Sequence, residues 1–134
     1  MSIQNLKLQG GSGVSHTMNI AIEMKDIDAL AAACERLGIE MLPYGVHKLF
    51  SSNRETGIGV MLTGWSYPVV VKDNGMVAFD NFNGRWGDEA KLNELKAYYG
   101  LEKAKIEARR AGYSVYESFD EVTNDLVLRI SIGG

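Results

Sequence analysis

The segment from Asp88 to Gly112 is predicted to form a helix that carries apolar residues on two sides. One side is formed mainly by large side chains: Leu92, Leu95, Tyr99 and Ile106. The other side, roughly 180° away at about 100° per residue, is formed by Leu101, Ala104, Ala108 and Ala111. A surface helix normally has a single apolar stripe. This helix therefore either kinks near Gly100 or is covered on two sides, by a sheet that wraps around it or by a partner.

The stretch from Thr17 to Gly38 is predicted to form a strand followed by a helix. Apolar residues alternate with other residues over Thr17–Met24, which is the period-two pattern of a half-buried strand. Asp26 and Asp28 offer side-chain oxygens that cap the start of a helix. Apolar residues then recur at helical spacing: Leu30, Ala33, Cys34 and Leu37. Gly38 stands where a left-handed C-cap is expected.

Short strands are predicted on both sides of the second helix. Before it come two short apolar runs that Pro43 and Gly45 break, Ile39–Tyr44 and Val46–Ser51, and then Gly57–Thr63, Tyr67–Lys72 and Met76–Asp80. Asn74-Gly75 is a strong hairpin signal between the last two runs, and Val115–Asp120 with Asp125–Ile132 forms a closing hairpin. The order β-α-β-β-β-β-α-β-β predicts an α+β fold with a mainly antiparallel sheet and the two helices on one face.

The chain has 134 residues, of which 46% are hydrophobic, so it can build one core without disulfides or metals. We expect a single domain over residues 15–134. Residues 1–14 end in a linker-like Gly10–Gly13 stretch and are expected to be a flexible extension or a loosely attached first strand.

No apolar run approaches the ~18 residues that span a bilayer, and Met1–Val14 lacks the features of a secretory signal. A cytoplasmic protein with no membrane partner is expected.

The sequence contains no recognisable catalytic or metal-binding motif. A metal site needs three or four converging ligands, and a set of His16, His47 and Asp80 follows no motif. Cys34 lies in an alanine-rich helical pattern and is expected to be a buried structural thiol. No serine stands in a Gly-x-Ser-x-Gly context, and Gly57-x-Gly59 lies within a strand pattern. We therefore predict no metal and no cofactor, and we favour a protein that is not an enzyme.

The loop from Asn81 to Asp88 is the best candidate for a binding site. It contains Arg85, which can pair with phosphate or carboxylate, and Trp86, which offers a flat face for stacking. A small-molecule or nucleotide site, binding or hydrolytic, would use Asp80, Arg85, Trp86, Tyr99 and His16. The alternative is a connection whose Phe82 and Trp86 fill the edge of the core.

The formal net charge of -3 and the pI of about 5.4 argue against a general nucleic-acid-binding protein, because such proteins usually carry a basic excess. The lysines and arginines of the second helix are interleaved with glutamates, a pattern that is typical of a solvated helix. Contact with RNA or DNA would use the part that leans basic: Lys103, Lys105, Arg109 and Arg110. We do not expect nucleic acid to be the main partner.

Scattered positions in both halves of the chain resemble the pattern of a known family. They are Ser15-His16, Ile20, Ile22, Asp28, Leu30 and Leu37-Gly38, then Asp80, Trp86, Leu92-Asn93, Tyr99, Glu107 and Gly112-Tyr113. On these residues the chain resembles an uncharacterised family of cyanobacteria, chloroplast hypothetical reading frames, other bacteria and phages, domain of unknown function number twelve fifty-seven. The resemblance implies a shared fold over residues 15–132 and no established activity. Leu101 and Glu102 stand where some members carry tyrosine and histidine.

These observations favour a non-enzymatic binding or accessory module that acts in a homo-oligomer or with a partner protein. The absence of a catalytic constellation, the two-sided helix and the number of hairpin strands with potential open edges all motivate this hypothesis. A small-molecule or nucleotide site at the 80–88 loop is the alternative, and weak nucleic-acid binding is the third hypothesis.

Overall fold

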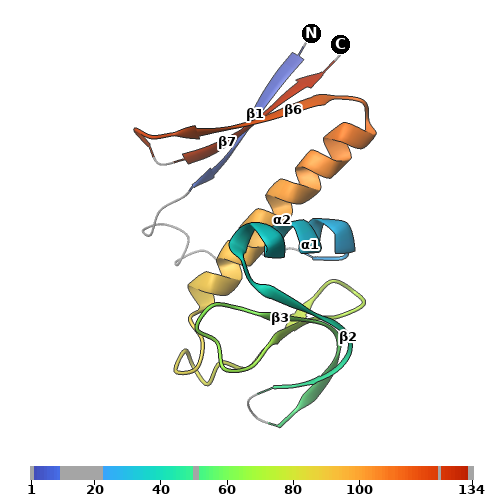
Figure 1. The fold of residues 1–134 in the computed structure, drawn as a ribbon, viewed down its shortest axis with the longest axis vertical. Coiled ribbons are helices and arrows are strands. Elements are labelled where there is room, and N and C mark those ends of the chain that lie inside the picture. The colour runs from blue at the N-terminus through green and yellow to red at the C-terminus, as the bar shows by residue number, and fades with distance from the viewer. Residues whose placement is uncertain (1, 10–22, 50–51, 124, 133–134) are drawn as a thin grey trace.

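The computed structural model describes residues 2–9, 23–49, 52–123 and 125–132, which form two helices and two antiparallel sheets (Figure 1). The helices are α1 (Ile27–Leu37) and α2 (Glu89–Arg110). The first sheet, here called the terminal sheet, has the order β1-β7-β6 and consists of β1 (Ser2–Gln9), β6 (Ser114–Asp120) and β7 (Asp125–Ile132). The second, here called the central sheet, has the order β2-β3-β4-β5 and consists of β2 (Glu40–Lys48), β3 (Arg54–Met61), β4 (Val69–Val71) and β5 (Val77–Ala78).

The α+β class and the antiparallel pairing are confirmed, since every strand pair in both sheets is antiparallel. The expectation of one sheet is wrong. α2 has 22 residues and is therefore about 33 Å long, so it carries the closing hairpin away from the central sheet (Figure 1). The hairpin pairs instead with β1, which supplies the first strand of the chain. Most of the strand expected over Thr17–Met24 lies outside the described residues.

β2 shows how a strand can pass through a proline. β2 (Glu40–Lys48) continues through Pro43 and Gly45, so it joins most of the predicted run Ile39–Tyr44 to the start of the run Val46–Ser51 in one strand. Positions 50 and 51 lie outside the described residues. The register of β2 against β3 shifts between Leu42 and Gly45. A bulge of this kind leaves a residue outside the ladder, so the missing N–H of proline costs no hydrogen bond there.

Aspartates cap the starts of both helices, and glycines follow their ends, where the sequence predicts them. The carboxylate of Asp26 accepts hydrogen bonds from the backbone N–H groups of Asp28 and Ala29 at the start of α1, and Asp88 caps α2 in the same way. After α1, Gly38 has a φ of 66°, and after α2 Gly112 has a φ of 84°. Both glycines adopt the left-handed conformation that closes a Schellman motif.

α2 runs through Gly100 as one helix and is shared by two hydrophobic cores. The larger core lies between α1, the central sheet and α2: Met24, Ala29, Leu30, Ala33, Cys34, Val60, Leu62, Trp65, Val69, Val71, Leu92, Leu95 and Tyr99. The smaller core lies under the terminal sheet: Leu101, Ala108, Leu128 and Ile130. Ile106 packs against the larger core and Ala104 against the smaller one. The two apolar sides of the helix are therefore covered by two parts of the same chain.

The turn between β4 and β5 fixes the approach to α1. Gly75 has a φ of 82°, and its carbonyl accepts a hydrogen bond of 2.8 Å from the backbone N–H of Met24. β4 and β5 pair antiparallel on the two sides of this turn, so the predicted hairpin at Asn74-Gly75 is confirmed. The bond from Met24 also ties the segment that leads into α1 to this hairpin. In the described part of the chain, no helix combines the length and the apolar character needed to cross a membrane.

Because both cores share α2, we predict that they unfold together. Leu95 and Leu128 are fully buried in the larger and the smaller core, respectively. Leu95→Ala and Leu128→Ala should each lower the free energy of unfolding by about 2–5 kcal/mol. Thermal unfolding followed by circular dichroism and by calorimetry should show one transition for both variants. Val122→Ala, at a residue that is 95% exposed, is the control and should unfold like the parent; two separate transitions for Leu128→Ala would contradict a shared unit.

Candidate functional site

The connection between β5 and α2, residues 80–88, is held by its own hydrogen bonds. Asn81 is only 6% exposed, and its side-chain amide donates to the carbonyl of Gly87 at 2.9 Å. The carbonyl of Asn81 accepts from the backbone N–H of Trp86 at 3.0 Å. The carboxylate of Asp80 accepts from the backbone N–H of Phe82 at 3.0 Å. These bonds close residues 80–88 into a compact loop, which we call the 80–88 loop.

Three successive residues at the tip of this loop have positive φ angles. The values are 52° for Phe82, 55° for Asn83 and 90° for Gly84. Such a conformation suits glycine and asparagine, but it is unfavourable for a bulky residue such as phenylalanine. A residue held in this region costs on the order of 1–3 kcal/mol, and it persists only where the surroundings determine it. Here the hydrogen bonds of Asn81 and Asp80 hold the backbone of the loop in this conformation.

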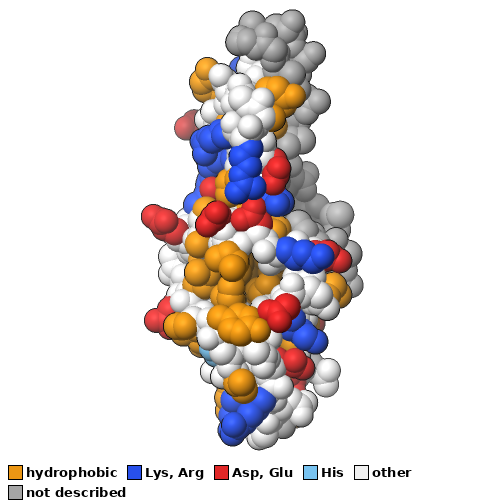
Figure 2. Space-filling view, turned by 90° about the vertical axis from the view of Figure 1, so that its right-hand side faces the viewer, with side chains coloured by type: hydrophobic (Ala, Val, Ile, Leu, Met, Phe, Trp, Pro, Cys, Tyr) orange, Lys and Arg blue, Asp and Glu red, His pale blue; other side chains and the backbone are white. Residues whose placement is uncertain are grey.

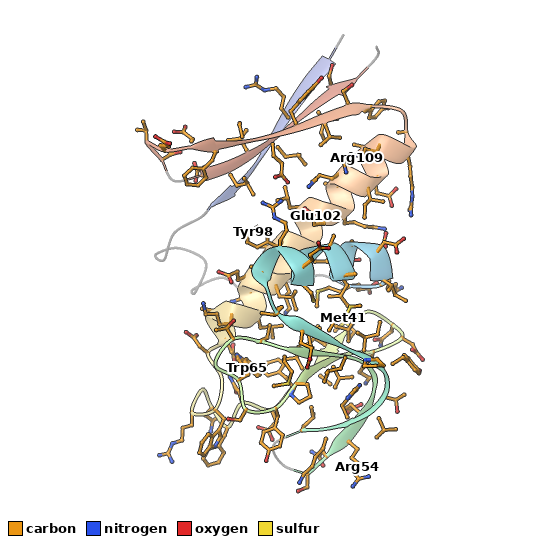
Figure 3. The ribbon with its side chains drawn as sticks, in the orientation of Figure 1. Met41, Arg54, Trp65, Tyr98, Glu102 and Arg109 are labelled. Atoms are coloured by element: carbon orange, nitrogen blue, oxygen red, sulfur yellow. The ribbon has the colours of Figure 1, made fainter. Side chains whose placement is uncertain are left out.

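A buried tryptophan forms the base under the loop. Trp65 is 6% exposed, its indole N–H donates to the carbonyl of Asp88 at 3.1 Å, and its ring meets Phe79 edge-on at 5.8 Å. Gly87 lies so close to the Trp65 ring that a Cβ atom at this position would overlap it. Figure 3 shows Trp65 between the central sheet and the first turn of α2.

Two aromatic side chains and an arginine are exposed on this hydrogen-bonded loop. Phe82 is 44% and Trp86 45% exposed, and the guanidinium of Arg85 lies 5.5 Å from the centre of the Phe82 ring. Phe82 and Trp86 therefore do not fill the edge of the core, which was the alternative that the sequence left open. Trp65 and Asn81 occupy that place, and no pattern in the sequence distinguishes Trp65 from Trp86 in this respect.

Tyr99 does not belong to this site. It is 2% exposed, and its hydroxyl accepts a hydrogen bond from the backbone N–H of Asp26 at 2.9 Å. It lies eleven residues after the N-cap Asp88, roughly 16 Å along α2. Asp80, Arg85 and Trp86 do lie together in the loop, while His16 lies outside the described residues. His47 is on β2, where its Nε2 lies 3.0 Å from the carbonyl oxygen of Pro43.

A network of four charged side chains, which the sequence did not reveal, joins both helices to β6. Arg36 of α1 lies 3.2 Å from Glu102 of α2 and 2.5 Å from Glu117 of β6. Lys105 lies 3.0 Å from Glu102 and 2.8 Å from Glu117. The guanidinium of Arg36 also lies over the ring of Tyr98, at 5.0 Å. Glu102 and Lys105 stand three residues apart, but Glu117 is 81 residues from Arg36, so local patterning could not reveal the network.

The four basic residues proposed for nucleic-acid contact do not form one surface. Lys103 and Arg110 are seven residues apart and share a face of α2, whereas Lys105 and Arg109 lie on a different face, at about 100° per residue. Lys103 pairs with Asp26 at 3.2 Å and with Glu107 at 3.0 Å. Lys105 belongs to the four-charge network described above. A continuous basic stripe is therefore not present on α2.

A shallow depression of about 580 Å³, open to solvent, lies at the start of α1. It is lined by Lys25, Asp26, Ile27, Asp28, Lys103 and Arg110. Its lysines are engaged with carboxylates, since Lys25 pairs with Glu23 and Lys103 with Asp26. Figure 2 shows hydrophobic side chains gathered in the middle of this face of the molecule, with Lys and Arg side chains above them.

The described residues supply no reactive thiol and no metal-ligand cluster. Cys34 is buried, and burial raises the pKa of its thiol to about 11. Because the thiolate is the nucleophilic form, Cys34 is inert at neutral pH, as its helical pattern suggested. No group of three or more histidine, cysteine, aspartate or glutamate side chains converges within the described part of the chain.

Comparison of the chain with family models, with curated proteins and with solved structures gives no match in any of the three. The resemblance to the uncharacterised cyanobacterial and chloroplast family therefore stays a prediction.

If Trp65 positions the 80–88 loop, a methyl group between them should disturb both. Gly87→Ala should lower the free energy of unfolding by about 1–3 kcal/mol, because the added Cβ overlaps the Trp65 ring. Tryptophan fluorescence should also shift. Gly45→Ala is the matched control, because nothing lies within 4 Å of a Cβ at that position, and it should change stability by less than about 0.5 kcal/mol. An unperturbed Gly87→Ala variant would show that the loop is not held against Trp65.

The four-charge network predicts a loss of stability in acid. Burial would raise the pKa of Glu117, but the hydrogen bonds from Lys105 and Arg36 outweigh it and hold this pKa below its ordinary value of 4.5. A carboxylate with a lowered pKa in the folded state stabilises the protein above the unfolded pKa, and this contribution disappears as pH falls through the folded pKa.

The difference in unfolding free energy between the parent and Glu117→Gln should thus be constant near neutral pH and shrink below about pH 4.5. Urea unfolding across this pH range measures it. Glu94→Gln, at an exposed glutamate of α2 that has no ion pair among the described residues, should show little pH-dependent difference from the parent. A difference for Glu117→Gln that does not change with pH would contradict the proposed role of the network.

Proposed function

We propose that the chain is a non-enzymatic binding module that holds a partner protein through the 80–88 loop. The observation that carries this proposal is the exposure of Phe82, Arg85 and Trp86 on one loop. The backbone of this loop is strained and is held by hydrogen bonds within the loop. Tryptophan and arginine are among the residues that contribute most to the energy of protein–protein interfaces. A rigid loop presents them at a low cost in conformational entropy.

The strain of the loop supports a role in binding. An unconstrained connection between β5 and α2 would relax Phe82 out of its positive φ angle. Instead, the side chain of Asn81 bonds to the carbonyl of Gly87, Gly87 lies against Trp65, and Phe82 is 44% exposed. A structural connection has no need of this arrangement, whereas a surface that must bind another protein does.

A partner protein fits the loop better than a small molecule does. Small-molecule sites are concave and enclose most of the ligand, whereas Phe82, Arg85 and Trp86 are exposed on the loop. Tyr99, which a nucleotide site would have used, is buried and bonded to the backbone of Asp26.

Nucleic acid is disfavoured by the net charge of -3 and by the division of the basic residues over two faces of α2. A cytoplasmic location and membership of the family that the chain resembles are part of the same proposal.

Cross-linking in cells, followed by affinity measurement, tests the proposal. A photoreactive amino acid in place of the exposed Ser66, whose N–H donates to the carbonyl of Trp86, should cross-link the chain to one recurrent protein. With that protein purified, Trp86→Ala should weaken binding by about thirtyfold, which corresponds to about 2 kcal/mol. Arg85→Ala should weaken it as well.

Tyr44→Ala is the matched control, because Tyr44 is an aromatic residue that is 58% exposed and lies on β2. It should leave the affinity unchanged, and all three variants should unfold at the temperature of the parent. Unaltered affinity of Trp86→Ala would refute the role of the loop. A small molecule retained by the parent and lost by Trp86→Ala in native mass spectrometry would instead favour the small-molecule site.

A further inference from the structure

The outer edge of β6 is poorly protected against pairing with another strand. β2, at the edge of the central sheet, contains Pro43 and a register shift, and β5, at the opposite edge, has two residues. β6 has seven residues in unbroken register with β7, and it contains neither proline nor lysine. Proline, lysine and bulges are the devices by which proteins prevent edge-to-edge pairing.

The side chains of β6 are those of a pairing strand. Tyr116 is 61% and Phe119 55% exposed, although aromatic residues on a strand gain stability from neighbours across the ladder. Glu117, in the middle of the strand, is held towards the helices by Arg36 and Lys105. The acidic group is therefore turned towards cations of its own chain, and Tyr116 lies on the opposite face of the strand.

Two charged residues without ion pairs flank β6. Arg109 in the last turn of α2 precedes the strand, and Glu121 in the β6–β7 turn follows it. Both are exposed, and neither belongs to an ion pair among the described residues. They stand at opposite ends of a strand of seven residues, roughly 23 Å long, so they cannot reach each other within one copy. An antiparallel second copy reverses the strand and places each Glu121 beside the end of α2 of the other copy.

We propose that the chain forms a two-fold dimer in which β6 pairs antiparallel with β6 of a second copy, joining the two terminal sheets into one. The pairing is centred on Tyr116. A centre at Glu117 would set two glutamates directly opposite each other, which is unfavourable. With Tyr116 at the centre, the two tyrosines face each other and Glu117 lies opposite Val115. Arg109 of each copy then pairs with Glu121 of the other.

This interface is separate from the 80–88 loop, so its test does not depend on the proposed function. Light scattering coupled to gel filtration should show the mass shifting from monomer towards dimer as the protein concentration is raised. Trp86→Ala should dimerise like the parent. A monomer at every concentration would overturn the proposal, whatever the loop binds.

Cysteine cross-linking tests the register. Tyr116→Cys should form a disulfide between two copies on mild oxidation, because facing Cα atoms of an antiparallel pair are about 4.5–5.5 Å apart. Buried Cys34 does not compete. Ser118→Cys is the matched control on the same face of β6, and its two copies would lie roughly 13 Å apart, too far for a bond. Equal cross-linking of both variants, or of neither, would overturn the register.

A charge exchange tests the contact between the two copies. Arg109→Glu alone and Glu121→Arg alone should each weaken dimerisation by about tenfold, because each places two like charges side by side at both ends of the interface. The double variant should regain the affinity of the parent. Additive weakening in the double variant would show that the two residues do not meet, and it would overturn the arrangement.

Discussion

Burial of α2 on two sides is the constraint on which the rest of the structure depends. Leu95 and Tyr99 anchor the helix in the larger core, while Leu101 and Ala108 anchor it in the smaller one. Because the two sets of side chains point in different directions, neither sheet could be removed without exposing one side of the helix to water. The helix therefore contributes side chains to both cores. The four-charge network around Arg36 joins α1, α2 and β6, and Figure 3 shows its member Glu102 on α2 between the two sheets.

The 80–88 loop owes its shape to the same packing. It connects the central sheet to the first turn of α2, and Trp65 fills the space between them. The rigid base allows a strained backbone at Phe82 and Asn83, because the hydrogen bonds of Asn81 would be lost if the loop relaxed. The packing of Trp65 in the larger core and the exposure of Phe82 and Trp86 are therefore linked. The surface that we assign to binding depends on that packing.

The charges of α2 acquire different roles from their positions. Lys105 is 13% exposed in its side chain and pairs inside the network, whereas Arg109 on the last turn has no such partner among the described residues. The sequence predicts that all these residues lie on a solvated helix, because a pattern of interleaved lysines and glutamates does not show which of them form ion pairs in the folded protein. Which of them is paired was decided by residues of α1 and β6, far away along the chain.

The sequence by itself determined the local features of this protein. The caps at Asp26 and Asp88, the turn at Asn74-Gly75 and the two apolar sides of α2 all follow from interactions within a few residues, and the structure contains each of them. The tertiary structure decided the division into two sheets and the burial of Trp65 in place of Trp86. Burial depends on which distant segments pack together, and propensity and periodicity carry no information about that choice.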